Sequence, residues 1–485
     1  ASSGRELRTG AVFELTDTGN ADRLVDRHGA DVRFLPEWGW MVWTGKQWVR
    51  DELKARNLAV KTARAIHTEA AKATDVKEQA SISEWARKSQ SAQRVQAMLW
   101  CAQPDLAASP DEFDKQPWLL PVANGCLDLS TGSLHPHRRQ HFLTRACPVV
   151  FDAKAQCPEW QKFLERILPN RDVREYIQRF AGYSLTGSTS EQCLAFLYGS
   201  GRNGKSVFLE TLGLLLGDYH TATRVESLAV TRGGGIPNDV AALAGARLVS
   251  VSETPEDVRL NESLVKDLTG GDTITARFLR HEFFQFKPQF KLWIRGNHKP
   301  QIRGTDDGIW RRLALVPFTV QIPPNEVDPE LSERLKGELS GILNWAVEGC
   351  RVWQKSGLKP PQAVTEAVSD YRNEMDTLGE FIADCCLVDT KAKTPAYSLY
   401  GAYKDWCDNS GHNPVSTTRF GLALGEKGFS KVKSGVVHWR GIGLATDSGQ
   451  LDSSDTCRSS PQSRARNKGN AEMGSKLSEP SGDVF

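Results

Sequence analysis

The sequence predicts an α/β protein, in which a core domain with a central parallel sheet follows an α+β accessory domain and precedes a winged-helix-like domain. Three observations support this fold class. Residues 193–217 form the pattern of an apolar strand, a glycine-rich turn and an amphipathic helix. Residues 247–253 and 290–297 are further apolar runs of the kind that buried parallel strands show. Residues 397–442 have the pattern helix, turn, helix and basic hairpin, which is typical of a winged helix.

The composition is that of an ordinary globular protein. Of the 485 residues, 39% are hydrophobic and 25% are charged. At roughly 150 residues per domain, this length suits about three domains, each with its own core. The formal net charge is only +2, so a nucleic-acid site has to be a local basic patch.

The sequence gives no support for membrane or metal-scaffold classes. No apolar run approaches the roughly 18 residues of a membrane span, and residues 1–20 lack the layout of a secretory signal. The chain is therefore expected to be soluble and cytoplasmic, with no membrane partner. Its ten cysteines include no C-x-x-C pair, which argues against a zinc ribbon or a disulfide framework. The histidine-rich run at 135–141 is irregularly spaced and is expected to be an exposed loop.

The first third of the chain is expected to form an accessory α+β domain, and its sequence alone indicates no catalytic or binding activity. Residues 34–49 place four tryptophans around a TGK turn, with the alternation of a hairpin. Such a hairpin is either a base-stacking platform or the core of a small sheet, and the core is favoured. Residues 51–117 are expected to be mainly helical, 126–129 to be a short strand between two turns, and 159–185 to be helical again.

The glycine-rich turn predicts a phosphate site. Residues 199–206, GSGRNGKS, satisfy the pattern G-x-x-x-x-G-K-[ST]. The glycines let backbone N–H groups converge on phosphates at the start of a helix, where the helix dipole favours anions. Lys205 is then expected to reach the β- and γ-phosphates of ATP, and Ser206 to bind Mg²⁺. The residues expected to contact the nucleotide are Gly199, Gly201, Asn203, Gly204, Lys205 and Ser206.

A triphosphate site also needs a carboxylate, and the second apolar strand supplies one. The run RLVSVSE ends in Glu253, which is expected to bind the metal ion and polarise the attacking water. Many such strands end in two acids, whereas Ser252 occupies the first of those places here. The division between metal ligand and base therefore stays open.

The third and fourth apolar strands supply an amide and two arginines. Asn297 follows the strand at 290–297 and is expected to contact the γ-phosphate or the attacking water. Arg311 and Arg312 stand at the entrance of another apolar strand. A guanidinium supplied by a neighbouring subunit stabilises phosphoryl charge in hydrolysis. Arg312 is the first choice for this role, Arg311 is the second, and one of the two is expected to make a surface salt bridge.

This ordered set of motifs resembles the superfamily 3 helicases, specifically the poxvirus D5-like and phage P4-like primase-helicases of viruses, phages and plasmids. The phosphate loop, Ser252-Glu253, the KDLTGGD segment at 266–272, Asn297 and Trp310-Arg311-Arg312 occur in the order of that family. Upstream, NGCLDLSTG, CPEW and RFAGYSLTGSTSEQ are similar to the accessory domain that precedes the ATPase in the family.

The resemblance implies a fold and an activity. It implies an AAA+-like ATPase that assembles into a homohexameric ring, with ATP and Mg²⁺ between subunits and single-stranded DNA in the channel. Family members travel 3′ to 5′, and many carry a primase domain at the N-terminus. No such domain is visible in this sequence, so priming is not assigned to the chain, and a primase domain or protein remains a possible partner.

The segment between the second and third strands predicts a DNA contact. Residues 273–278 and 282–286 are β-prone and flank a basic tip. Such a hairpin contacts phosphates without reading bases, although a solvated hairpin with ordinary charges is the alternative. The residues expected to bind DNA are Lys266, Arg277, Arg280, His281 and Lys287.

The winged-helix-like segment has its own candidate basic face, which is suited to DNA or to a protein partner with about equal weight. That face consists of Arg419, Lys427, Lys431, Lys433 and Arg440. The expected organisation is a tag or flexible terminus (1–10), an accessory domain (11–190), the ATPase domain (191–345), a helical connector (346–376), the winged-helix-like domain (377–445) and a disordered tail (446–485).

Taken together, these patterns predict a replicative DNA helicase acting on single-stranded and forked DNA. Two rivals stay open. One is a ring ATPase that loads a helicase, or packages or remodels DNA, without separating strands. The other is a non-enzymatic initiation module in which nucleotide only locks a ring.

Overall fold

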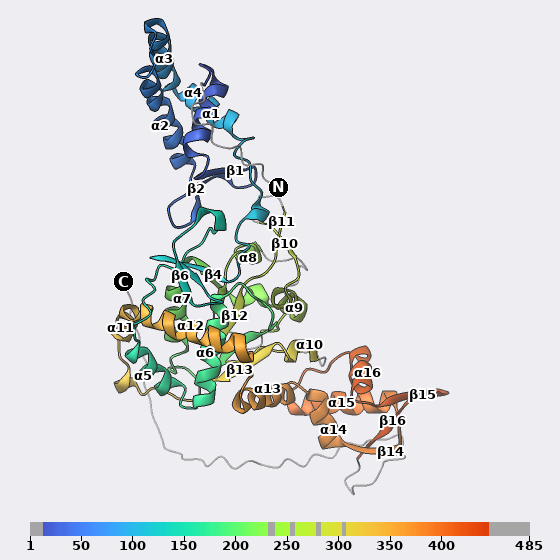
Figure 1. The fold of residues 1–485 in the computed structure, drawn as a ribbon. Coiled ribbons are helices and arrows are strands. Elements are labelled where there is room, and N and C mark those ends of the chain that lie inside the picture. The colour runs from blue at the N-terminus through green and yellow to red at the C-terminus, as the bar shows by residue number, and fades with distance from the viewer. Residues whose placement is uncertain (1–12, 231–237, 253–257, 278–282, 303–306, 446–485) are drawn as a thin grey trace, which may run out of the picture. The chain divides into compact units, whose positions relative to one another are not determined.

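The computed structural model describes residues 13–230, 238–252, 258–277, 283–302 and 307–445. The chain forms two compact units, which divide between Met375 and Asp376 (Figure 1). Each unit has its own hydrophobic core. The expected disordered tail and the first ten residues lie outside the described residues. Among the described helices, none combines the length and the apolar character needed to cross a bilayer.

The first unit begins with a helical region that packs on a small antiparallel sheet. Its three strands are β1 (Val32–Leu35), β2 (Gly39–Trp43) and β3 (Trp48–Arg50). Trp40 and Trp48 are 4% and 1% exposed, so this aromatic hairpin is a core, as favoured from sequence. The helices are α1 (Asp17–His28), α2 (Glu52–Ala70), α3 (Val76–Ser89) and α4 (Ala92–Ala102). Side chains of Asp51, Asp75 and Ser91 accept hydrogen bonds from backbone N–H groups at three of the helix starts.

A second antiparallel sheet and two helices lead to the core domain. The sheet consists of β4 (Leu119–Val122), β5 (Gly125–Asp128) and β6 (Ser133–His135), and β5 is the short strand expected from sequence. Short 3-10 turns flank it at η1 (Pro110–Glu112) and η2 (Arg139–His141). The helices are α5 (Pro158–Ile167) and α6 (Arg171–Leu185), which confirms the predicted helical stretch.

The core domain is a five-stranded parallel sheet with the order β13-β7-β12-β9-β8. This sheet confirms the predicted α/β class. β7, β9, β12 and β13 are the four apolar strands expected from sequence, and β8 adds an edge strand that was not expected. The bounds are β7 (Leu194–Tyr198), β8 (His220–Thr223), β9 (Leu248–Val251), β12 (Lys291–Gly296) and β13 (Leu313–Pro317).

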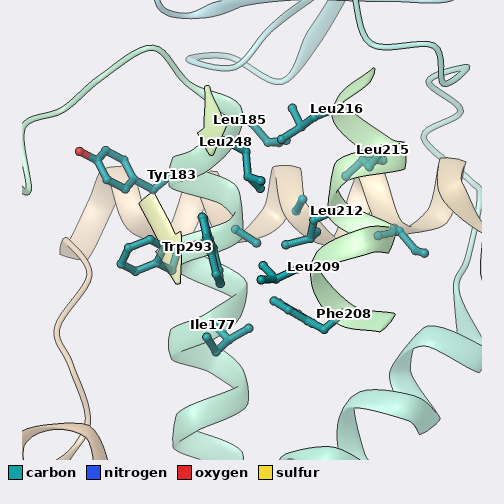
Figure 2. Close-up of a cluster of buried hydrophobic side chains, with 14 of the residues drawn as sticks. Ile177, Tyr183, Leu185, Phe208, Leu209, Leu212, Leu215, Leu216, Leu248 and Trp293 are labelled. Carbon is teal, nitrogen blue, oxygen red and sulfur yellow. The ribbon is translucent and has the colours of Figure 1, made fainter. Parts of the chain in front are cut away.

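Helix α7 (Lys205–Leu216) follows the glycine-rich turn and packs into the main core of the unit. Figure 2 shows its Phe208, Leu209 and Leu212 lying against residues of α6, β9 and β12. Trp293 of β12 is fully buried there, and its indole Nε1 donates a 3.0 Å hydrogen bond to Ser184 of α6. Helix α12 (Leu339–Ser356) packs along α6. Because α6 precedes the sheet in the chain and α12 follows it, helices from both ends of the core domain pack together here.

The remaining elements of the first unit lie between its strands or follow β13. Between β8 and β13 lie η4 (Val225–Leu228), α8 (Asn238–Ala241), α9 (Glu262–Gly270), the hairpin β10 (Ile274–Ala276) and β11 (Phe284–Phe286), and α10 (Asp307–Trp310). The others are η3 (Gly217–Tyr219), η5 (Pro324–Glu326), α11 (Leu331–Gly337) and α13 (Gln362–Glu374).

The second unit has the predicted helix, turn, helix and hairpin. Gly411 ends α15 in the left-handed region, at φ 75°, where glycine is favoured. The structure adds α14 and a long strand, β14, which pairs with β16 and makes a three-stranded sheet. The elements are α14 (Thr377–Cys385), β14 (Cys386–Pro395), α15 (Ala396–Ser410), α16 (Thr417–Glu426), β15 (Ser430–Ser434) and β16 (Val436–Leu444).

Candidate nucleotide-binding site

The turn between β7 and α7 requires glycine at two positions, because any larger side chain there would collide with neighbouring atoms. Gly204 lies at φ 83°, and a Cβ there would approach Ile167 Cγ2 to 2.6 Å. A Cβ on Gly199 would approach the Phe318 carbonyl oxygen to 2.2 Å, which is closer than any real contact. A Cβ on Gly201 would have no atom within 4 Å, so crowding does not explain the glycine at this position. The turn is therefore packed tightly against α5 and the end of β13.

Lys205 is the first residue of α7 and is only 5% exposed. Its Nζ donates to the Gly199 carbonyl at 2.6 Å, to Asn203 Oδ1 at 3.0 Å and to Asn297 Oδ1 at 3.1 Å. Ser206 is exposed on the same first turn of the helix. Lys205 is therefore held at the carboxyl edge of the sheet, beside backbone N–H groups at a helix start, where an anion is favoured.

Asn297 lies beside Lys205 because of the strand order. It directly follows β12, which pairs in parallel with β7 on one side and β9 on the other. Sequence analysis expected this amide near the γ-phosphate, and the structure places it against the Lys205 ammonium group at the end of the glycine-rich turn 199–205, the predicted phosphate turn. The two residues are 92 positions apart in the chain.

The predicted carboxylate, Glu253, lies outside the described residues. Its strand is described: β9 ends at Val251, which pairs in register with Ile294 of β12. The following Ser252 is exposed, and its N–H donates to the Thr223 carbonyl at 3.1 Å. The chain thus leaves β9 at the carboxyl edge that holds Lys205 and Asn297. The roles of Glu253 as metal ligand and base stay predictions.

The two arginines lie at the opposite edge of the sheet. Leu313 of β13 pairs with Leu194, and Pro317 pairs with Tyr198, so Arg311 and Arg312 precede the start of a strand that runs toward the turn. Five strand residues span about 16 Å, which separates these side chains from their own phosphate turn. Neither arginine is therefore placed to complete the site of its own chain.

The same two arginines differ in burial. Arg312 is 8% exposed, and it donates from Nε to Thr269 Oγ1 at 3.2 Å and from Nη1 to the Gly308 carbonyl at 2.8 Å. Arg311 is exposed. Sequence analysis put Arg312 first for a role at a neighbouring subunit, whereas the structure gives the accessible position to Arg311.

The predicted DNA hairpin is formed by β10 and β11, which pair antiparallel from Ile274↔Phe286 to Ala276↔Phe284. Arg277 is exposed on the tip side of the hairpin and Lys287 is exposed at its base, while Lys266 lies half-buried on α9. Arg280 and His281, the expected tip residues, lie outside the described residues.

Sequence analysis did not single out Phe283, which borders the hairpin tip. This side chain is 65% exposed, and the Arg277 guanidinium lies 4.9 Å from its ring centroid. The available signal was the pair Phe283-Phe284, because strand alternation sends one of two adjacent aromatic side chains toward solvent.

A pocket of about 350 Å³ opens beside the phosphate turn. Arg202 and Gly204 of the turn line it, together with Val207 of α7. Its other walls come from α5 and from residues 322–331, which follow β13. Sequence analysis missed this pocket because its walls are far apart along the chain.

A cluster around Lys299 lies just beyond Asn297. Its Nζ donates to both carboxylate oxygens of Glu374, at 2.8 and 2.7 Å. The same ammonium lies 4.9 Å from the ring centroid of Tyr198 and 5.3 Å from that of Tyr371. The end of α13 is therefore joined to the carboxyl edge of the sheet, close to the end of β7.

Within the described part of the chain, no group of three or more His, Cys, Asp or Glu side chains is arranged to hold a metal ion. A magnesium ion that arrives with a nucleotide needs fewer protein ligands, because phosphate oxygens and water supply most of its coordination. The exposed Ser206 hydroxyl at the start of α7 suits such an ion.

In the second unit, the candidate basic side chains have different surroundings. Lys427 pairs with Asp376, and Lys431 lies 5.0 Å from the ring centroid of Trp439. Arg440 is exposed on β16, opposite Lys393 of β14. Lys433 and Arg419 are also exposed. Because Lys431 is opposite Trp439 in the register of β15 and β16, Arg440 projects from the other face of the sheet than Lys431 and Lys433. The five basic side chains therefore do not form the single face expected from sequence, and what they bind stays a prediction.

Sequence models of three families match consecutive parts of the chain. Residues 21–169 match "D5 N terminal like", residues 197–312 match a family of unknown function called DUF5906, and residues 373–439 match "Poxvirus D5 protein-like". The second of these ranges contains the phosphate turn, Asn297 and both arginines.

Curated relatives come from large DNA viruses. "Putative helicase L207/L206" of Acanthamoeba polyphaga mimivirus is 31% identical over 330 residues, which cover 62% of this chain and 34% of the relative. "Putative helicase 022R" of Frog virus 3 is 26% identical, covering 55% and 29%. "Putative primase C962R" of African swine fever virus (isolate Warthog/Namibia/Wart80/1980) is 26% identical, covering 61% and 34%. The chain thus spans about a third of the length of the relatives it matches.

Among solved structures, the apo C-terminal region of NrS-1 aligns with 61% of this chain and 77% of that chain, at 10% identity and a TM-score of 0.38. So loose a likeness adds nothing to the parallel sheet described above. The family matches do more, because D5-type domains flank the phosphate site on both sides. The chain carries matches to two D5-type families, and its relatives are named as helicases and primases of large DNA viruses, which is consistent with a D5-like primase-helicase family.

Proposed function

We propose that this chain is the helicase part of a primase-helicase, an ATP- and Mg²⁺-dependent DNA helicase of a virus, phage or plasmid. The observation that carries the proposal is the contact between Lys205 and Asn297 at the carboxyl edge of the parallel sheet. The names of the curated relatives, which are helicases and primases, support it.

In the proposed reaction, the phosphates of ATP lie across the turn and accept hydrogen bonds from its backbone N–H groups. Lys205 exchanges part of its present bonding to Gly199 and Asn203 for contacts to the β- and γ-phosphate oxygens. Ser206 holds the magnesium ion, which supplies charge stabilisation to the phosphates when it is bound. Asn297 is then positioned by Lys205 to orient the γ-phosphate or the attacking water.

Glu253 is proposed to take the proton of the attacking water and to share the metal ion. This rests on its position two residues beyond β9, at the edge where Lys205 and Asn297 meet. A carboxylate at that edge completes the groups that phosphoryl transfer to water needs.

A neighbouring subunit is proposed to supply the remaining cation. Arg311 is exposed at the amino edge of the sheet, about 16 Å of strand away from its own turn. A head-to-tail ring brings one subunit's amino edge to the next subunit's phosphate turn, and such interfaces close into rings. The proposed assembly is a homohexamer with ATP between subunits.

The hairpin of β10 and β11 is proposed to grip the DNA. Arg277 and Lys287 offer phosphate contacts, and Phe283 offers a stacking surface for an unpaired base. Separating a stacked base-pair step costs about 1.4 kcal/mol, which one hydrolysis event can cover. Movement is proposed to run 3′ to 5′ along single-stranded DNA in the channel.

A forked-DNA assay with wild type and Lys205→Ala tests the proposal. We expect ATP-dependent strand displacement by wild type and none by the variant, while a control variant of the exposed Lys355, Lys355→Ala, behaves as wild type. Hydrolysis without displacement would favour a loader or a packaging or remodelling motor. Absence of hydrolysis, with and without single-stranded DNA, would exclude a motor of any kind.

A further inference from the structure

Helix α2, in the helical region at the start of the first unit, presents a row of hydrogen-bond donors to solvent. Lys54, Asn57, Lys61 and Arg64 follow one another at steps of three and four residues, and each of them is exposed. Residues three or four apart lie on the same side of a helix, so these side chains form one line. At 1.5 Å per residue, the line is about 15 Å long. We call these four residues the α2 donor row.

The opposite side of α2 is packed. Ala55, Ala59 and Ala63 are buried there, in the cluster that also contains Val42 of β2 and Val95 of α4. Small side chains on this side let α2 lie close to its neighbours. The α2 donor row therefore stands on an element whose backbone is fixed by the core of this region.

The α2 donor row contains no acid, and both acids of α2 have partners away from it. Glu52 accepts a 3.0 Å hydrogen bond from the Trp40 N–H. Glu69 pairs with Arg23 at 2.9 Å and with Arg27 at 3.0 Å. In the described part of the chain, the three cations of the row have no carboxylate within ion-pair distance. Their charge is therefore available to a binding partner.

The neighbouring helix α3 shows an ordinary solvated face for comparison (Figure 1). Its exposed charges have both signs, and Lys88 pairs with Glu84 at 2.7 Å, one helical turn away. Such mixing of signs keeps the local field weak, whereas the α2 donor row concentrates one sign.

Positive charge also gathers beside the row. Burial is the main cause that lowers the pKa of His28, at the end of α1, and Arg27 lowers it further. The charge of Lys61 adds to this lowering, against an opposite contribution from Asp31. Lys61 thus acts on a neighbouring basic group, which is what an unneutralised cation does.

The chemistry of the row fits the phosphate oxygens of a nucleic-acid duplex. Lys and Arg supply charge and Asn supplies a neutral donor, and proteins use these groups on the DNA backbone. Sites for single strands combine such cations with aromatic rings on which unpaired bases stack. Helix α2 contains no Phe, Tyr or Trp. A duplex keeps its bases stacked on one another and needs only the backbone contacts.

We propose that the α2 donor row binds the phosphate backbone of double-stranded DNA, as a contact different from the hairpin of β10 and β11. The inference rests on the proposed function, since it takes DNA as the substrate of the chain. It adds that the helical region at the start of the first unit holds the duplex arm of a fork without reading its sequence.

The test uses the full chain and compares two double variants with the same change of charge. Lys61→Glu/Arg64→Glu reverses two cations of the row, and Lys77→Glu/Arg87→Glu reverses two exposed cations of α3. A second row variant, Lys61→Gln/Arg64→Gln, removes the charges without reversing them. Because all of these positions are exposed, each variant is expected to melt as wild type does, and melting is measured first.

Fluorescence anisotropy measures the binding of a labelled blunt duplex and of a labelled single strand at several salt concentrations. Wild type is expected to bind both. In both row variants, duplex affinity should fall about tenfold or more, and the slope of log K against log salt should become shallower by about 0.9 or more for each phosphate contact that is lost. The α3 variant should keep the wild-type slope, and single-strand affinity should change little in every protein.

Equal losses in the row variants and the α3 variant would overturn the inference, because they would report net charge alone. Wild-type duplex affinity in both row variants would also overturn it. A loss confined to the single strand would assign the row to strand binding and would overturn the duplex assignment.

ATP hydrolysis without DNA is the arm that separates this inference from the proposed function. The row variants are expected to hydrolyse ATP as wild type does, while Lys205→Ala does not. Wild-type hydrolysis by Lys205→Ala would count against the proposed function and not against the row. A wild-type chain that binds neither DNA would overturn both.

Discussion

The two edges of the central sheet each bury a lysine, but the surroundings of these lysines differ. At the carboxyl edge, Lys205 meets two side-chain amide oxygens, those of Asn203 and Asn297, and one carbonyl. At the amino edge, Lys291 is 1% exposed and donates to the carbonyls of Thr186, of Ser188 at 3.1 Å and of Gln289 at 3.2 Å. Side-chain amides can turn toward a ligand, whereas backbone carbonyls are fixed. The hydrogen-bond partners of Lys205 can therefore change when a ligand binds, whereas those of Lys291 are fixed by the backbone.

Neighbouring groups strengthen the contrast. Arg247, next to Lys291 at the start of β9, is 2% exposed and donates to the Leu185 carbonyl at 2.6 Å and the Leu119 carbonyl at 2.8 Å. Leu185 is the last residue of α6, where the helix dipole favours cations. Burial nevertheless lowers the pKa of Lys291 well below its usual value. These two cations fasten α6 and the accessory segment to the sheet.

The largest expected effect is loss of hydrolysis on changing Lys205 to Ala. The ammonium that neutralises phosphate charge is removed, so phosphate release should fall to background, by more than about 10³-fold. Because Asn203 and Asn297 are side chains that can turn to other partners, the melting temperature should change little. If the melting temperature of Lys205→Ala fell as far as that of a variant in the hydrophobic core, the proposed contrast between the two edges would be wrong.

The second largest effect is expected at the amino edge, where replacing Arg311 should affect hydrolysis and replacing Arg312 should affect stability. Arg311→Ala should lower hydrolysis by about 10³-fold or more with normal nucleotide binding, as expected for a cation supplied by a neighbour. Arg312→Ala should instead lower the free energy of unfolding by about 1–3 kcal/mol, since it leaves the Thr269 hydroxyl and the Gly308 carbonyl without this donor.

Phosphate release, nucleotide binding and denaturant unfolding of both arginine variants distinguish these effects. Normal hydrolysis in Arg311→Ala together with a large loss in a stably folded Arg312→Ala would reverse the assignment.

Replacing Lys291 by Met should destabilise the fold rather than the site. Three buried carbonyls lose their donor, so the free energy of unfolding should fall by about 3–5 kcal/mol. Urea unfolding measures the loss, with Lys355→Met on exposed α12 surface as the matched control. ATP affinity of the folded fraction should be that of wild type, and weaker binding there would show that the amino edge also serves the nucleotide.

A smaller effect is expected outside both edges, at the hairpin. Phe283→Ala should weaken single-stranded DNA binding by about 1–3 kcal/mol, the value of one stacked base. Fluorescence anisotropy with a labelled oligonucleotide measures it, and Phe283→Tyr should retain most of the affinity because a ring remains. Equal weakening by the Tyr and Ala variants would argue against stacking.

The smallest effect is a pH dependence at the amino edge. His220 begins β8, its Nε2 lies 2.8 Å from Ser250 Oγ, and burial lowers its pKa below the usual 6.5. The unfolded chain therefore binds more protons there, so the contribution of His220 to stability is complete above pH 6.5 and is lost as the pH falls. His220→Gln should show a shallower fall in unfolding free energy below pH 6.5 than wild type. An identical fall in both proteins would mean that His220 titrates as it does in the unfolded chain.

Local patterns were enough to predict one edge and not the other. The strand-turn-helix pattern at 193–217 and the position of Asn297 at a strand end identify the carboxyl edge, because parallel strands bring their ends together. Lys291 and Arg247 resemble surface residues in sequence, and only the packed fold shows the carbonyls that surround them. The burial of Arg312 escaped sequence analysis for the same reason, and so did the pocket between α5 and residues 322–331. Glu253, Arg280 and His281 stay predictions from their patterns alone.

The Lys299 cluster has a consequence for how the two units are linked. Lys299 follows Asn297 by two residues, and Glu374, which it holds, stands two residues before Asp376, the first residue of the second unit. The polypeptide therefore leaves the first unit from an anchor on the phosphate side of the sheet. One ion pair therefore connects the segment that follows Asn297 to the last turn of α13, two residues before the second unit begins.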